Sequence, residues 1–173
     1  MAQLVLTAVG LDRPGLVREL TQGFQRHGVS VGDSRMVNLR GLFAWIALIE
    51  GDAGALALVR EELPRAASSL GLSLSLHDHA VAPARPASVP YRLRTYSMDR
   101  PGIVHALSST LARHGVNIES LDTRAESAPF DGTPLFTLEA RLSVPATLSL
   151  ARLREDVRAA ADSLNCDFDL DRA

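Results

Sequence analysis

The sequence predicts an α+β protein built from two copies of a β-α-β-β-α-β unit, each an antiparallel sheet with its helices on one face. The segment Asp12–Gly15 returns as Asp99–Gly102, and Arg26–Val29 returns as Arg113–Val116. Both pairs lie 87 positions apart in a chain of 173 residues, which indicates a tandem duplication. We therefore expect a first domain at residues 1–80, a proline-containing linker at 81–90 and a second domain at 91–173.

The elements of the first copy follow from hydrophobic periodicity and turn residues. Val17, Leu20 and Phe24 recur at helical spacing, and Gly28 is placed to end that helix. Pro64 falls inside the second helical pattern, where we expect it to kink or end the helix. The expected order is a strand at 3–9, a helix at 17–27, strands at 29–39 and 42–50, a helix at 56–70 and a strand at 72–79.

The second copy repeats this order. Val104, Leu107 and Leu111 predict the inward side of its first helix. We expect strands at 91–97, 116–126, 135–144 and 166–170, helices at 101–114 and 150–164, and a longer loop at 127–134. In both copies the sheet face without helices is bare, and we expect a neighbouring unit to cover its apolar residues.

Composition excludes several classes of function. The formal net charge is −2, so the chain has no excess of the basic residues with which a duplex-DNA binder neutralises phosphates, and direct binding of DNA is disfavoured. All 18 basic residues are arginine, which excludes catalysis by a Schiff-base or P-loop lysine. No secretory signal and no apolar run of about 18 residues is present, so we expect a cytoplasmic protein without a membrane segment.

The repeated loop before the first helix of each copy is the candidate site. Each proline fits a first helical turn, and the carboxylates of Asp12 and Asp99 are expected to accept a hydrogen bond from a free amide there. Gly15 and Gly102 lack a Cβ and let another group approach the backbone closely. A helix N-terminus of this kind favours a bound carboxylate, although the same residues also make a competent cap with no ligand.

The pattern Asp-Arg-Pro-Gly-[Leu/Ile]-Val, followed by His-Gly-Val-[Ser/Asn]-[Val/Ile], resembles the ACT domain in both halves. This resemblance implies two ferredoxin-like units that sense a small molecule, such as glycine or serine, bound between two ACT units. It also implies a regulator of transcription without a DNA-binding domain, which acts through a protein partner such as a transcriptional activator. We expect a homodimer, no cofactor and no enzymatic activity.

The resemblance carries ligand contacts onto the two loops and the start of each following strand. Asn117 matches an asparagine often found there, whereas the first copy has Ser30, so the two sites are not equivalent. His105 is a further candidate for a ligand carboxylate. The candidate residues are Leu11, Asp12, Arg13, Pro14, Gly15, Leu16, Val17 and Ser30 in the first copy, and Met98, Asp99, Arg100, Pro101, Gly102, Ile103, Val104, His105 and Asn117 in the second.

Three alternatives stay open at this point. A small hydrolase shares the β-α-β-β-α-β order, but the glycine-rich arginine loop of acylphosphatase is absent. RNA-recognition modules also share it, yet they stack bases on aromatic residues, and this chain has one Trp, two Tyr and five Phe. A pair of ACT units that binds only protein is the third. His27 and His114 are expected to be structural, and His77 and His79 lack a third metal ligand nearby.

Overall fold

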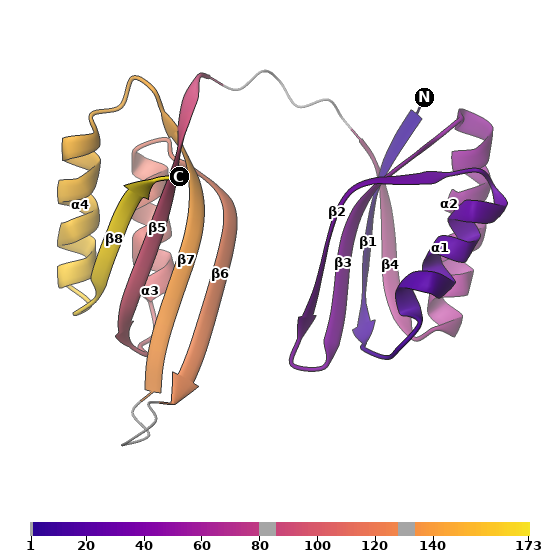
Figure 1. The fold of residues 1–173 in the computed structure, drawn as a ribbon, viewed down its shortest axis with the longest axis horizontal. Helices are drawn as coiled ribbons and strands as arrows, with labels where there is room; N and C mark the ends of the chain where they lie inside the picture. The colour runs from indigo at the N-terminus through magenta and orange to yellow at the C-terminus, as the bar shows by residue number, and fades with distance from the viewer. Residues whose placement is uncertain (1, 80–85, 128–133) are drawn as a thin grey trace. The chain divides into compact units, whose positions relative to one another are not determined.

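The computed structural model describes residues 2–79, 86–127 and 134–173. The chain divides into two units, Met1–Ala82 and Pro83–Ala173, each with the six elements in the predicted order. The α+β class and the β-α-β-β-α-β order are therefore confirmed (Figure 1). The expected linker at 81–90 is too long, because a strand already begins at Ser88. Its residues 81–85 lie outside the described part of the chain.

The first unit is a four-stranded antiparallel sheet in the order β2-β3-β1-β4. Figure 1 shows both of its helices on the same side of this sheet. The bounds are β1 Ala2–Leu11, α1 Leu16–Arg26, β2 Ser30–Leu39, β3 Leu42–Gly51, α2 Ala53–Ser69 and β4 Leu72–Asp78.

The second unit has the same topology, with strand order β6-β7-β5-β8 and all neighbours antiparallel. Residues 128–133 of the expected loop lie outside the described residues. The bounds are β5 Ser88–Met98, α3 Ile103–Arg113, β6 Asn117–Ser127, β7 Pro134–Pro145, α4 Leu150–Asp162 and β8 Asp167–Arg172.

Each unit has its own apolar core between the sheet and the helices. In α1 the buried side chains are Leu16, Leu20 and Phe24, four residues apart, and the Phe24 ring lies 6.2 Å from Trp45. The sequence placed Val17 inward instead, but it is 41% exposed. The same correction applies to Val104, which is 37% exposed, because Leu16 and Ile103, each one residue earlier in the sequence, take the buried positions.

Pro64 neither ends nor divides α2, which runs as one helix from Ala53 to Ser69. Pro64 is exposed, so the carbonyl that loses its hydrogen-bond partner can be hydrated. Packing of Leu63 and Ala67 on either side of it in the buried row outweighs the local cost. Among the described residues, no helix is both long enough and apolar enough to cross a membrane.

The face of the first sheet opposite the helices is apolar, as expected. Antiparallel partners point to the same face, so the register gives two cross-strand rows on it. One row joins Leu11, Leu42 and Leu39, and the next joins Val9, Ala44 and Val37. Leu11 and Leu39 are 77% and 66% exposed, so this open face of the first unit is available for contact.

The corresponding face of the second sheet differs from the expectation, because most of it is charged. Arg92 and Arg94 point to this face from β5, and Glu139 of β7 lies between them at 3.4 and 3.9 Å. Covering these groups with an apolar surface would cost their hydration. The expectation of an apolar face in need of cover therefore holds for the first unit only.

Gly28 is required by its backbone conformation. It has φ 67°, and the N–H groups of Gly28 and Val29 bond to the carbonyls of Gln25 and Phe24 at 3.2 and 3.0 Å. This pair of bonds ends α1 as a Schellman motif.

We predict that Gly28→Ala lowers the free energy of unfolding by about 1 kcal/mol, because alanine is strained at positive φ. Urea titration followed by circular dichroism measures this. Gly23→Ala is the matched control: Gly23 lies within α1 and its Cβ would meet only Leu63 Cδ1 at 3.4 Å, so no loss is expected. Equal losses for the two variants would contradict the prediction.

Candidate functional site

Both repeated loops form the same turn between a strand and a helix. Gly15 has φ 97° and ψ −10°, and Gly102 has φ 102° and ψ −11°. Proline followed by a glycine with these angles is the signature of a type II β-turn. The prolines thus lie before the helices. The sequence had suggested that they lie in the first helical turns, and this is wrong. Each glycine is needed because its φ is positive. This is a second reason for glycine, beside the predicted close approach of another group to the backbone.

The aspartates do not cap the helices. The Asp12 carboxylate instead accepts a hydrogen bond from the Asn38 side-chain amide of β2, and the Asp12 N–H donates to Gly41 at 2.9 Å. The Asp99 N–H likewise donates to the Pro134 carbonyl at 2.9 Å. Neither α1 nor α3 has a side-chain cap bond, so the aspartate positions fix the loop to a neighbouring hairpin and leave the first-turn amides uncapped.

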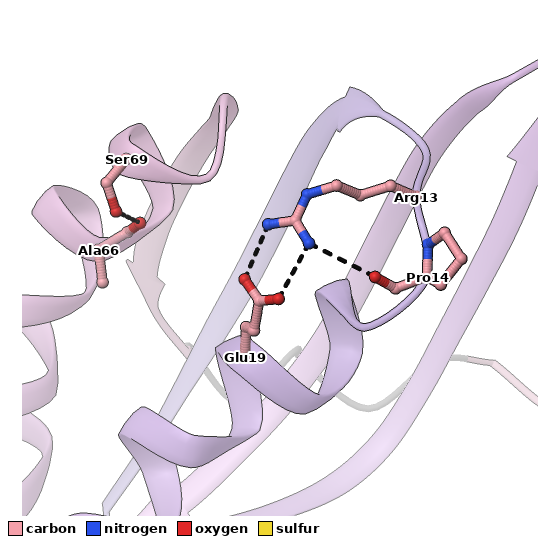
Figure 2. Close-up of polar contacts among 5 residues, drawn as sticks. All are labelled: Arg13, Pro14, Glu19, Ala66 and Ser69. Carbon is pink, nitrogen blue, oxygen red and sulfur yellow. Dashed lines mark hydrogen bonds and ion pairs between the residues drawn. The ribbon is translucent and has the colours of Figure 1, made fainter.

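Arg13 forms a two-fold contact with Glu19 in α1. Its two terminal nitrogens lie 2.9 and 2.8 Å from the two carboxylate oxygens, and Figure 2 shows the group also reaching the Pro14 carbonyl, at 3.4 Å. The hydrogen bond with Arg13 holds the pKa of Glu19 below its ordinary value, and the same bond raises the pKa of Arg13. A carboxylate of the chain thus already occupies the guanidinium of the first loop.

The second loop lacks this contact. The position equivalent to Glu19 at the 87-residue offset is Ala106. In the described part of the chain, the Arg100 side chain makes no hydrogen bond or ion pair. A Cβ at Gly102 would have nothing within 4 Å, whereas one at Gly15 would lie 3.3 Å from Glu19 Oε1.

The starts of β2 and β6 lie at the other end of each unit from the loops. Asn117 pairs with Ser143, which pairs with Pro90 near the start of β5, whereas the loop follows the end of β5. The eleven-residue helix α3 separates the two positions by about 16 Å. Ser30 is placed in the same way opposite Glu50. A single unit therefore does not bring the predicted loop and strand positions together.

The remaining candidates divide by exposure. Leu16 and Ile103 are 2% and 1% exposed, so their side chains belong to the core and only their backbones face the turn. Asn117 Nδ2 donates to Glu119 Oε1 at 2.6 Å. Beside the exposed residues of the Asp-Arg-Pro-Gly motifs themselves, the candidates with exposed side chains on or after the loops are Leu11, Val17, Met98, Val104 and His105.

His27 and His114 connect the two helices of each unit. His27 Nε2 lies 2.9 Å from Glu62 of α2, and His114 Nε2 lies 2.7 Å from Asp156 of α4. Each histidine thus has an acidic partner on the second helix of its unit, which fits the predicted structural role and which the sequence did not reveal. Within residues 2–79, 86–127 and 134–173, no group of three or more potential ligands could hold a metal ion.

Comparison with known proteins places the chain in a family. The model of the ACT domain matches residues 2–77, and a second ACT-domain model matches residues 91–150. The chain belongs to the ACT-domain family and carries two such domains in tandem.

Relatives extend over nearly the full chain. The glycine cleavage system transcriptional repressor of Escherichia coli (strain K12) is 26% identical over 162 residues, which cover 94% of this chain and 85% of the repressor. A crystal structure of an unknown protein from Galdieria sulphuraria aligns with a TM-score of 0.86 and 28% identity, over 99% of this chain and 98% of that one. A UPF0237 protein of Methanopyrus kandleri is 32% identical over 83 residues, covering 47% of this chain and 92% of that protein.

We predict that the Arg13–Glu19 pair stabilises the first unit at neutral pH but not in acid. Because its pKa is lowered on folding, Glu19 stabilises the fold above its unfolded pKa and ceases to do so as the pH falls through the folded value. Glu19→Gln should melt below the wild type at pH 7, and the difference should close below about pH 4. Thermal unfolding at several pH values tests this.

The control is Glu61→Gln, since Glu61 is exposed on α2 and has no ion pair in the described residues. Its difference from the wild type should not follow the same pH course. A difference for Glu19→Gln that persists unchanged into acid would contradict the assignment.

Proposed function

We propose that this chain is a regulatory protein that senses a small amino acid, such as glycine or serine, and acts through a protein partner such as a transcriptional activator in the cytoplasm. The observation that carries the proposal is the repeated Arg-Pro-Gly turn, with its uncapped helix amides and adjacent arginine. Donors of this kind suit the carboxylate of an amino acid. Similarity to a named repressor over 94% of the chain supports a regulatory role and not an enzymatic one.

The separation of the loop from the strand start supports a ligand bound between units. Because one unit holds Met98–Val104 and Asn117 at opposite ends, a ligand can touch a loop and a strand start together only where two units meet. Ligand binding would then change how units associate. Such a ligand shifts an equilibrium only by its difference in affinity for the two forms, about 1–3 kcal/mol in typical cases.

The open face of the first unit supports a homodimer. A sheet of strands about ten residues long offers a face of roughly 600 Å², near the lower end of what one partner contributes to a specific interface. The two rows nearest the β2–β3 turn are aliphatic, the next joins Thr7, Ile46 and Arg35, and the same face on a second copy matches the two aliphatic rows. The charged face of the second unit fits such a surface less well.

The sensing proposal predicts heat when the purified chain is titrated with amino acids up to millimolar concentration. Isothermal calorimetry with each of the twenty amino acids measures this. Asn117→Ala should weaken binding while the fold survives, because the side-chain amide can contact both charged groups of the ligand. The absence of heat for all twenty would contradict the proposal.

The dimer proposal predicts that Ile46→Glu shifts the chain toward a monomer in light scattering coupled to size exclusion. Ile46 is 50% exposed on the open face, and a carboxylate there would be desolvated in a dimer. Leu58→Glu is the matched control, since Leu58 is 47% exposed on α2. A chain that remains a dimer with Ile46→Glu, as it should with Leu58→Glu, would contradict this use of the open face.

A further inference from the structure

The two loops share one backbone but differ in what faces their arginine. Turn angles agree within 5° at the glycines of the two loops, so Arg13 and Arg100 project from equivalent positions. The Glu19 carboxylate accepts hydrogen bonds from both terminal nitrogens of Arg13 and lies against the Gly15 turn. The equivalent residue in the second unit, Ala106, has no carboxylate to offer Arg100. The difference is chemical and not conformational.

We propose that the loop of the second unit alone receives the ligand carboxylate, and that Glu19 permanently occupies the equivalent place in the first unit. This inference rests on the proposed amino-acid sensing. An arginine binds a carboxylate best through two parallel N–H donors, and Glu19 uses both of those on Arg13. In the first unit the carboxylate on Arg13 comes from Glu19 of the same chain, whereas in the second unit the carboxylate on Arg100 would come from a bound amino acid.

Competition with a tethered group disfavours the first loop. A carboxylate held six residues away in the same chain, as Glu19 is from Arg13, acts at an effective concentration of about millimolar or more. A free amino acid must exceed that concentration or bind Arg13 much better than Glu19 does. Arg100 faces no such competitor among the described residues.

The strand that leads into the second loop carries polar groups that the first unit lacks. Thr95 is 0% exposed and Ser97 is partly buried, and neither hydroxyl has a hydrogen-bond partner in the described residues. Their equivalents in the first unit are Ala8 and Gly10, and a Cβ at Gly10 would lie 2.6 Å from Leu72. Thr95 lies on the same side of β5 as Leu93, inside the core, so only the Ser97 hydroxyl, which lines a pocket, is within reach of a ligand. An unpaired buried hydroxyl is costly and rare in proteins, and the one on Ser97 marks a place for a polar ligand.

A pocket of about 330 Å³ opens at the same end of the second sheet. Ser97 and Met98 line it together with Asp167, whose carboxylate suits an ammonium group. Its volume is in the range of small-ligand sites. The pocket and the unpaired hydroxyl of Ser97 favour a small zwitterion in the second unit, and Arg100, which is not part of the pocket lining, follows Met98 by two residues in the sequence.

A reciprocal exchange in the full-length chain tests this assignment. Ala106→Glu places a carboxylate beside Arg100, and Glu19→Ala removes the one beside Arg13. Glycine and L-serine are titrated separately in the calorimeter, with sodium acetate as a probe that has only the carboxylate. We expect one site per chain in the wild type and at least tenfold weaker binding with Ala106→Glu. With Glu19→Ala we expect a second site that binds acetate, and that binds glycine and L-serine more weakly than the first because the first unit has Gly10 in place of Ser97.

Two controls separate this result from effects on the fold. Ala112→Glu adds the same charge at an exposed position of α3, and Glu61→Ala removes a carboxylate from α2; both should bind as the wild type does. Thermal melts show whether the Ala106→Glu variant folds. If it does not, Glu19→Ala still tests the proposal.

The outcomes distinguish this inference from the function on which it depends. Wild-type binding that Ala106→Glu leaves unchanged, or two equal sites in the wild type, would overturn the assignment while amino-acid sensing stands. A stoichiometry that Glu19→Ala does not raise would show that Glu19 does not block the first loop. The absence of heat from glycine, serine and acetate with every variant would overturn both.

Discussion

The positive φ of one glycine in each unit is the constraint on which the rest of the site depends. Gly15 and Gly102 let the chain reverse from a strand into a helix within a single turn, which presents uncapped amides beside an arginine. A side chain at either glycine would be strained at this φ whatever space surrounds it. The two copies therefore share a backbone geometry and differ in the side chains placed around it.

The fold was predictable because duplication and periodicity are properties of short segments. The alternation of apolar and polar residues in β4 and the four-residue spacing of buried residues in α1 can each be recognised within a short segment. The repeat presents each such pattern twice. The errors were local too. Proline and glycine in sequence fit either a helix start or a type II turn, and only the angle at Gly15 decides between them.

The site was less predictable because its contacts join residues that are distant in sequence. Asn38 reaches Asp12 across a hairpin, and Glu62 reaches His27 across two packed helices. The Arg13–Glu19 contact is different, since a signal for it was present. Aligning the copies at their offset places Glu19 opposite Ala106, and a charge kept in only one copy of a repeated motif indicates that the copies differ there.

Two independent differences between the units point in the same direction. The first unit satisfies its loop arginine from within and exposes an aliphatic sheet face, which suits it for association. In the second unit, Arg100 and two hydroxyls have no partner among the described residues, and the open face carries Arg92, Arg94 and Glu139. We propose ligand binding for the second unit and association for the first. A ligand that bound both units equally would also affect the unit that is proposed to associate. Under the proposed function, ligand binding in the second unit and assembly through the first are separate equilibria, and a ligand shifts assembly only as far as it binds the two association states differently.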